Sequence, residues 1–380
     1  MTPAPYDAAP SVRGGVLAWL HVGDLHLTTE GAENHRDLGR IAALANALPP
    51  GSLDFAVLPG DNADDGTPEQ FRLVRDALAA LRLPLHVLPG DHDFKPRSLD
   101  AFYGVLGTRR LPYAESVKGH RCLFLDVVSA GTGGPDFRLG EAQLAWAERE
   151  LEAAQAAGEA AVVFMHTYPA DLREGGERLG KLLARPDVLC VDMGHTHYNE
   201  LANDGGTVFM ATRSTGQVEE GPPGFSVAAV DGRVVSWRFK TLDAAWPLVL
   251  VTQPADRRLM IAADQAVDGP FTVRAKVLGD AAVERVEVQV DGGDWTAMAP
   301  VPGEAALWAA DLPVPGASGV RVRARDARGR EDEDAVEPAY PGWVPPERAA
   351  DGSDSDRVGA WPAKGLLDTQ LGPNRRGRTW

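Results

Sequence analysis

The sequence predicts a layered α/β domain followed by a smaller all-β sandwich. From Val16 to about Thr241, short apolar runs such as VLAWLHV and AAVVFMH alternate with helical patterns. Such runs are typical of strands buried on both faces, and their alternation with helices indicates layers of helix and sheet. After Pro247 the helical period disappears and apolar residues alternate with polar ones in short stretches, which favours a β-sandwich.

A chain of 380 residues is long enough for two or three domains. We expect a flexible arm over residues 1–15, the α/β domain over 16–246, a sandwich of the immunoglobulin or fibronectin type over 247–340, and a tail over 341–380. The tail carries Trp343, Trp361 and Trp380, so we expect it to pack on a domain or on a neighbouring protomer.

Three local patterns predict individual elements of the α/β domain. Thr67 followed by Pro68 has the form of a helix start. Residues 140–157 place leucines on one face and charges on the other, which predicts an amphipathic helix. Residues 225–240 contain two alternating runs joined at Asp231-Gly232, which predicts a β-hairpin.

The charge balance restricts the class of partner. Lys and Arg number 38 against 54 Asp and Glu, which gives a formal charge of −16. An acidic surface repels phosphate backbones, which argues against sequence-independent binding of nucleic acid. It does not exclude a small anionic substrate held by metal ions.

The sequence also suggests a compartment. No apolar run approaches the roughly 18–20 residues of a membrane span, and the N-terminal residues do not resemble a signal peptide, so we expect a cytoplasmic protein. Cys122 and Cys190 each lie in an apolar run, which favours two buried small side chains over the alternative of a disulfide.

Five short polar motifs stand at the ends of predicted strands. They are Gly23-Asp24-Leu25-His26, Gly60-Asp61-Asn62-Ala63-Asp64, Gly90-Asp91-His92-Asp93, Met165-His166 and Gly194-His195-Thr196-His197. Ligands of open α/β sheets bind beyond the carboxyl ends of the strands, so we expect these motifs to converge. The other histidines match no motif, and we expect His21 and His86 to lie in strands and His35 and His120 on the surface.

The residue types in these motifs predict a metal centre. Three Asp and four His would repel one another without cations, and imidazole together with carboxylate suits Mn, Fe, Zn or Co. These ligands are too many for one ion, so two metals that share one carboxylate are the simplest arrangement. Taken singly, His166 would be interpreted as a core histidine and Gly-Asp-x-x-Asp as a capped turn.

The ordered set resembles the signature of the calcineurin-like metallophosphoesterase superfamily, D-x-H, G-D-x-x-D, G-N-H-D/E, H and G-H-x-H, over about residues 16–241. The opening WLHVGDLHL and the helix around 139–151 resemble bacterial class III cyclic nucleotide phosphodiesterases. The resemblance implies a four-layer α/β/β/α sandwich and a dinuclear centre of divalent or trivalent ions, with Mn or Fe favoured over Zn or Co.

The resemblance also implies the ligand assignment. Asp24, His26 and His197 would hold the first metal, Asp91, His166 and His195 the second, and Asp61 would bridge both. A water between the metals would attack phosphorus in line. His92 would act as general acid or would stabilise the transition state, with Asp93 orienting its ring.

Three departures from related patterns bear on the substrate. Asp91 stands where the family usually has Asn, and its negative charge favours diesters, which carry less charge than monoesters. Asp65 stands where Ser/Thr protein phosphatases carry an Arg, which disfavours that activity. Asp64 stands where purple acid phosphatases carry a ligating Tyr, which disfavours a tyrosinate–iron centre.

We therefore expect a metal-dependent hydrolase of a small phosphodiester, with cyclic nucleotides as the first candidate substrates and glycerophosphodiesters as the second. A phosphomonoesterase and a non-catalytic scaffold are the alternatives, and a nuclease is disfavoured by the acidic charge. We expect no nucleic-acid polymer and no membrane as partner. A homo-oligomer formed through the sandwich or the tail remains open.

Overall fold

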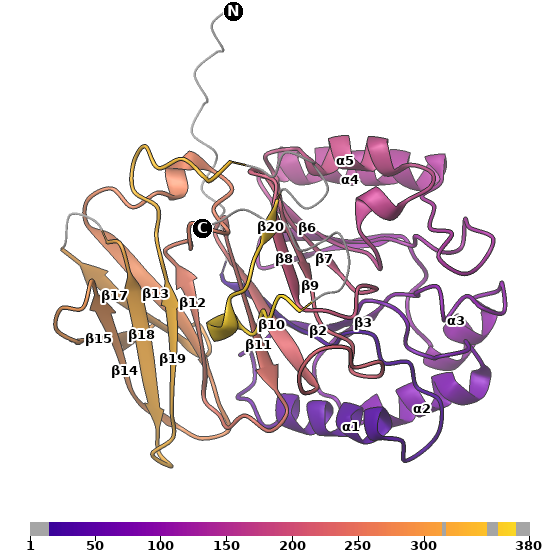
Figure 1. The fold of residues 1–380 in the computed structure, drawn as a ribbon, viewed down its shortest axis with the longest axis horizontal. Helices are drawn as coiled ribbons and strands as arrows, with labels where there is room; N and C mark the ends of the chain where they lie inside the picture. The colour runs from indigo at the N-terminus through magenta and orange to yellow at the C-terminus, as the bar shows by residue number, and fades with distance from the viewer. Residues whose placement is uncertain (1–14, 314–316, 348–355, 370–380) are drawn as a thin grey trace, which may run out of the picture.

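The computed structural model describes residues 15–313, 317–347 and 356–369. Two mixed sheets pack face to face, and helices cover the outer face of each, so the predicted four-layer α/β/β/α arrangement is confirmed (Figure 1). Two smaller antiparallel sheets lie beside these layers. Residues 1–14 of the predicted arm, and Trp380, lie outside the described residues.

The first sheet has five strands in the order β11-β10-β1-β2-β3. Its strands are β1 (Leu17–His21), β2 (Phe55–Leu58), β3 (Leu85–Val87), β10 (Gly224–Asp231) and β11 (Val234–Thr241). The first three run parallel, and β10 and β11 form the predicted hairpin. The helices that follow its strands are α1 (Glu33–Asn46), α2 (Pro68–Leu78) and α3 (Asp100–Leu106). Thr67 caps α2 as predicted, because its side chain accepts a hydrogen bond from the Gln70 amide.

The second sheet has seven strands in the order β20-β8-β9-β7-β6-β5-β4. Its strands are β4 (Tyr113–Val117), β5 (His120–Phe124), β6 (Ala160–Phe164), β7 (Val188–Met193), β8 (Glu200–Asn203), β9 (Val208–Ala211) and β20 (Arg357–Val358). Helices α4 (Glu141–Ala157) and α5 (Gly176–Leu183) cover its outer face, and η1 (Pro169–Asp171) precedes α5 (Figure 1). The predicted helix over 140–157 is α4, which buries Leu144 and Leu151.

The two sheets share an apolar core. Trp19 and Phe55 of the first sheet pack there with Phe124 and Phe164 of the second. The same core holds Cys122 and Cys190, which are both buried and free, as predicted. One polar group crosses the core: Asp192 of β7 accepts a hydrogen bond of 2.5 Å from the Trp19 indole and lies 2.6 Å from His21 Nδ1. These contacts fix the two sheets relative to each other.

The second unit is an antiparallel sandwich, in agreement with the predicted all-β class. One sheet has the order β12-β13-β17-β16 and the other β15-β14-β18-β19. The strands are β12 (Leu248–Gln253), β13 (Phe271–Leu278), β14 (Val283–Val290), β15 (Thr296–Ala297), β16 (Ala299–Pro300), β17 (Leu307–Leu312), β18 (Val320–Asp326) and β19 (Glu331–Val336), with η2 at Ala263–Gln265. Buried valines from both sheets, Val273 and Val288 among them, form its core.

The described part of the tail runs from the seven-stranded sheet to the sandwich. Strand β20 pairs with β8, and Trp361 joins the core between the two large sheets. After it, η3 (Pro362–Lys364) places the buried Lys364 ammonium 2.6 Å from the Asp334 carboxylate of β19. This part of the tail therefore contacts both the seven-stranded sheet and the sandwich.

His21 and His86 lie in β1 and β3 as predicted. The prediction for His120 was wrong: this residue begins β5 and is fully buried, and its Nε2 lies 3.1 Å from the Gly232 carbonyl oxygen at the turn between β10 and β11. His35 lies on α1 and is half-buried.

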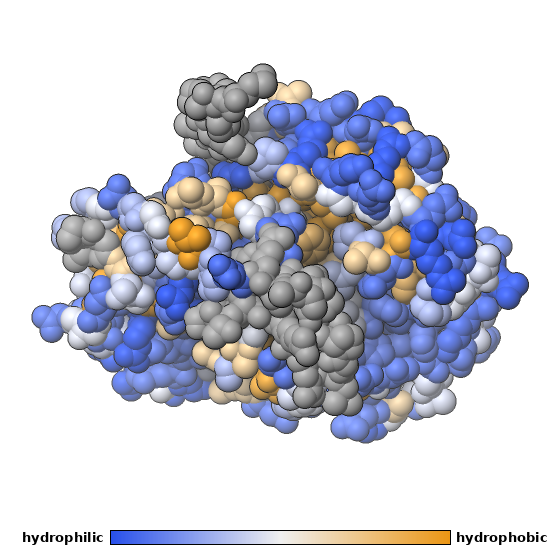
Figure 2. Space-filling view, turned by 45° about the horizontal axis from the view of Figure 1, so that its top comes forward, coloured by the Kyte–Doolittle hydropathy of each residue, from blue (hydrophilic) through white to orange (hydrophobic). Residues whose placement is uncertain are grey.

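Hydrophilic side chains cover much of the face shown in Figure 2. Within the described part of the chain, no helix combines the length and the apolar composition that crossing a bilayer requires.

Candidate metal centre

The structure brings all the predicted metal ligands together at the carboxyl ends of strands from both large sheets. The loops after β1, β2 and β3 supply Asp24, His26, Asp61 and Asp91, and the loops after β6 and β7 supply His166, His195 and His197. The residues separate into two groups that share one carboxylate. In each group the candidate ligand atoms all lie within 4.8 Å of one another.

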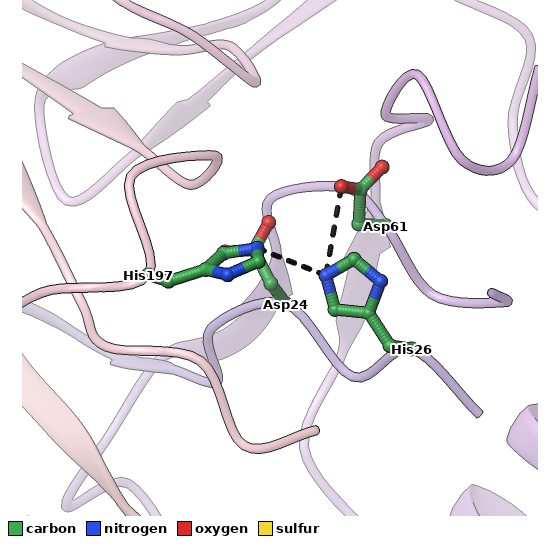
Figure 3. A group of neighbouring side chains, drawn as sticks. All are labelled: Asp24, His26, Asp61 and His197. Carbon is green, nitrogen blue, oxygen red and sulfur yellow. Dashed lines mark hydrogen bonds and ion pairs between the residues drawn. The ribbon is translucent and has the colours of Figure 1, made fainter. Parts of the chain in front are cut away.

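The first group consists of Asp24, His26, Asp61 and His197 (Figure 3). His26 Nε2 lies 3.0 Å from His197 Nε2 and 3.7 Å from Asp61 Oδ2. The loop after β1 and the loop after β7 therefore meet at this position.

The second group consists of Asp61, Asp91, His166 and His195. Asp91 Oδ1 lies 3.4 Å from His166 Nε2 and 3.5 Å from His195 Nδ1. Asp61 presents Oδ1 to this group, 3.6 Å from His166 Nε2, and Oδ2 to the first group. One carboxylate thus faces both groups, which is the geometry of a bridging ligand.

Unpartnered polar atoms show that the two groups fit metal ions. Asp24 Oδ2, Asp91 Oδ1 and His166 Nε2 are buried and have no hydrogen-bond partner among the described residues. A buried polar atom without a partner is costly, and a cation bound among these atoms would satisfy them. Imidazole and carboxylate together match the preferences of Mn, Fe, Zn or Co.

The charges of the site are strongly coupled. Burial raises the pKa of Asp61 well above its ordinary value, with His166 opposing the rise and Asp91 adding to it. Burial also opposes protonation of His166, but Asp61, Asp91 and Asp24 outweigh it and raise the pKa of that ring to about 10. Because these carboxylates attract a proton to His166, the same place is electrostatically favourable for a metal cation.

Two further ligands have pKa values shifted by this environment. Burial lowers the pKa of His26 to about 4, with Asp24 opposing the shift and His197 adding to it. Burial would raise the pKa of Asp91, but the neighbouring His166 and His195 rings hold it below its ordinary value. His26 is therefore neutral and Asp91 ionised near neutral pH, which are the forms that bind metals.

The backbone around the ligands is strained. His26, Asp61, His195 and His197 have φ values of 43°, 51°, 68° and 62°, in the left-handed region that few residues other than glycine adopt. Such conformations concentrate at functional sites, where the surrounding fold maintains them.

The glycines of the motifs have a steric role. A Cβ atom at Gly90 would stand 2.1 Å from Asp61 Oδ1 and 2.7 Å from His166 Cε1. At Gly60, which has a φ of 135°, a Cβ atom would stand 2.2 Å from His166 Nδ1. Any side chain at these positions would displace the Asp61 carboxylate or the His166 imidazole.

His92 stands beside the first group, with its side chain 24% exposed. Its ring is 4.4 Å from the His26 ring, and its backbone N–H donates to Asp61 Oδ1 at 2.9 Å. It is thus accessible to a substrate and held in place through the bridging residue.

The prediction that Asp93 orients the His92 ring was wrong. The Asp93 carboxylate is fully buried and accepts hydrogen bonds from the backbone N–H groups of Asn62, Ala63 and Gly90. It therefore fixes the loop after β2 to the loop after β3. The Asp93 side chain is buried, whereas the His92 ring is partly exposed to solvent.

Asp64 is the residue that contacts the His92 ring. Its carbonyl oxygen lies 2.8 Å from His92 Nδ1, and its Oδ1 lies 3.1 Å from that atom and 3.4 Å from His26 Nδ1. His26, Asp64 and His92 also form a third group with ligand atoms within 4.8 Å of one another. The G-D-x-x-D motif contained this residue, but only the folded arrangement shows that it faces both rings.

A cavity of about 440 Å³ opens beside the first group. The residues that line it are His26, Thr28, Glu33, Asn34, Asp37, Asp64, Thr215, Gly216, Gln217, Val218 and Pro223. His26 belongs both to the first group and to this wall, so the cavity adjoins the candidate metal position.

Phosphoesterases are among the known proteins to which this chain is similar. A family model described as calcineurin-like phosphoesterase matches residues 19–199. A glycerophosphodiester phosphodiesterase of Enterobacter lignolyticus is 32% identical over 47% of this chain and 69% of its own length. A 3',5'-cyclic adenosine monophosphate phosphodiesterase of Escherichia coli is 31% identical over 50% of this chain and 71% of its own length. A dimetal phosphatase from Danio rerio is 16% identical, with a TM-score of 0.49 over 61% of this chain and 97% of that chain.

The steric role of Gly90 is testable. We predict that Gly90→Ala weakens Mn²⁺ binding by about 10-fold or more, because the added methyl group displaces Asp61 and His166. Gly104→Ala is the control, since a Cβ atom there meets nothing within 4 Å. Competition with a chelating dye measures both affinities. Equal Mn²⁺ affinity in Gly90→Ala and the control would contradict the account.

Proposed function

Because the chain belongs to the calcineurin-like phosphoesterase family, we propose that it hydrolyses a small-molecule phosphodiester at a dinuclear metal centre. The observation that carries the proposal is the pair of ligand groups sharing Asp61, next to an accessible His92. Three of the seven candidate ligands would bind each metal and Asp61 would bridge both, with Mn or Fe favoured over Zn or Co.

The diester class is supported by two observations. Relatives that are about a third identical are named as phosphodiesterases of glycerophosphodiesters and of cyclic AMP. Asp91, with a side chain only 10% exposed, adds a negative charge to the second group. A monoester dianion is repelled more strongly by that charge than a diester monoanion. We therefore propose a cyclic nucleotide or a glycerophosphodiester as substrate.

Two bound ions would neutralise the phosphate oxygens and lower the pKa of the attacking water. In hydrolysis the water oxygen bonds to phosphorus while the ester bond to the leaving alcohol breaks, and the departing oxygen gains a proton. His92 is placed to supply that proton or to stabilise the charge that develops, because its ring is accessible and adjoins the first group.

Asp64 would position this ring. Its carbonyl oxygen and its carboxylate both face His92 Nδ1, so a proton on Nδ1 has acceptors and Nε2 is left for the substrate. The same carboxylate faces His26 Nδ1, which leaves His26 Nε2 for the first metal.

We predict that His92→Ala retains two metal ions per chain but loses kcat by roughly 10²-fold or more, because the variant keeps every ligand and removes the proton donor. Metal content is measured by mass spectrometry and kcat with an aryl phosphodiester. His35→Ala is the control, because this half-buried histidine lies on α1 outside the three groups. A loss of metal in His92→Ala would show instead that this residue is a ligand.

A paired assay tests the class of reaction. We expect the Mn²⁺-loaded protein to hydrolyse a bis-aryl phosphate faster than the corresponding aryl monoester, and a chelator to abolish both activities. Preference for the monoester would contradict the proposed role of Asp91 in selecting diesters. No hydrolysis of either compound by protein holding two metals would contradict the proposed function for simple esters.

A further inference from the structure

The segment between β9 and β10 carries none of the five sequence motifs, yet it contacts every candidate ligand that belongs to the first group alone. We propose that Glu219, in this segment, is a positioning residue that holds the His197 ring with Nε2 toward the first metal, an inference that rests on the dinuclear centre of the proposed function. Glu219 would then set the affinity of the first metal position and leave that of the second unchanged.

The segment packs against the first group through its backbone and its side chains. The Ser214 hydroxyl donates to the Asp24 carbonyl oxygen at 2.7 Å, and the Ser214 N–H donates to the His197 carbonyl oxygen at 3.3 Å. Gln217 Nε2 lies 3.3 Å from His26 Nδ1. The segment is therefore fixed against the loops that carry these ligands, and a side chain on it can orient a ligand ring.

The Glu219 carboxylate lies against the His197 ring. Its Oε1 is 3.3 Å from His197 Nδ1, and its Oε2 accepts a hydrogen bond of 2.6 Å from the Tyr198 hydroxyl. On the other side of the ring, His197 Nε2 lies 3.0 Å from His26 Nε2 within the first group (Figure 3). Because Nδ1 has an acceptor, the ring proton resides on Nδ1 and the lone pair of Nε2 remains for a metal.

The neighbouring residue fixes Glu219 in place. The Glu219 side chain is 49% exposed, whereas the next residue, Glu220, is buried. The Glu220 carboxylate accepts hydrogen bonds from the Asn199 N–H at 2.8 Å and from the Thr369 hydroxyl at 2.6 Å. Since Asn199 follows His197 by two residues, Glu219 contacts the ligand while Glu220 holds the same loop.

The tail supports the same arrangement. The Gly365 carbonyl oxygen accepts hydrogen bonds from the Asn199 side-chain amide at 2.9 Å and from the Arg213 guanidinium at 3.0 Å. The loop after β7 and the segment that carries Glu219 are therefore joined to one carbonyl group, which limits their movement relative to each other.

Titration of the metal-free full chain with Mn²⁺ tests the role of Glu219. We expect Glu219→Ala to raise one of the two dissociation constants by about 10-fold or more and to leave the other unchanged, because outer contacts of metal ligands contribute about this much to affinity. Glu219→Gln keeps an acceptor oxygen on a side chain of the same length and should retain most of the wild-type affinity. Glu152→Ala, at an exposed position of α4, is the control and should change neither constant. Competition with a chelating dye measures both constants.

Ligand variants identify the position that is weakened. His197→Ala removes a ligand of the first position, so the ion that stays tightly bound occupies the second, and adding Glu219→Ala should not change its affinity. His195→Ala leaves the ion of the first position, and adding Glu219→Ala should weaken its binding by about 10-fold. A residue that only stabilised the fold would weaken both ions alike.

The possible failures are distinguishable. Two unchanged constants in Glu219→Ala, a loss shared equally by both ions, or a Glu219→Gln variant as weak as Glu219→Ala would overturn the positioning role, while two ions bound by the wild-type chain would still support the dinuclear centre. Fewer than two Mn²⁺ bound by the wild-type chain would overturn the dinuclear centre and this proposal with it.

Discussion

The division of the candidate metal ligands between two sheets is the constraint on which the site depends. Four ligands follow strands of the first sheet and three follow strands of the second, and Asp61 faces both groups. The ligand atoms can meet only if the sheets keep one relative position. The aromatic core of Trp19, Phe55, Phe124 and Phe164, together with the Asp192 contacts to Trp19 and His21, sets that position.

The loops at the ends of the strands then bring the candidate ligand atoms close together, and their backbone is locally strained. Left-handed backbone at four of the ligands and the absence of side chains at Gly60 and Gly90 let carboxylates and imidazoles approach closely. Asp93 stabilises the site, because its buried carboxylate joins the loops after β2 and β3. The resulting cluster holds buried carboxylate and imidazole atoms that have no partner among the described residues, which favours bound cations.

Much of this arrangement could be predicted from the sequence, because periodicity and residue type are local properties. Apolar runs indicated the strands, and the order of Asp, Gly and His at their ends indicated the ligands that the structure brings together. The interactions that depend on side-chain direction could not be predicted. Asp93 follows His92 directly in the sequence yet faces the opposite way, whereas Asp64 comes from another loop. Apart from His26 and Asp64, the cavity wall combines residues near 28–37 with residues near 215–223, and neither of these two segments carries a motif.

The central claim is that Asp61 stands between two metal ions, and anomalous diffraction from crystals containing Mn²⁺ tests it most directly. The account predicts two anomalous peaks, one among Asp24, His26 and His197, the other among Asp91, His166 and His195, and both within bonding distance of Asp61. A single peak, or a peak enclosed by His26, Asp64 and His92 in place of either position, would contradict it.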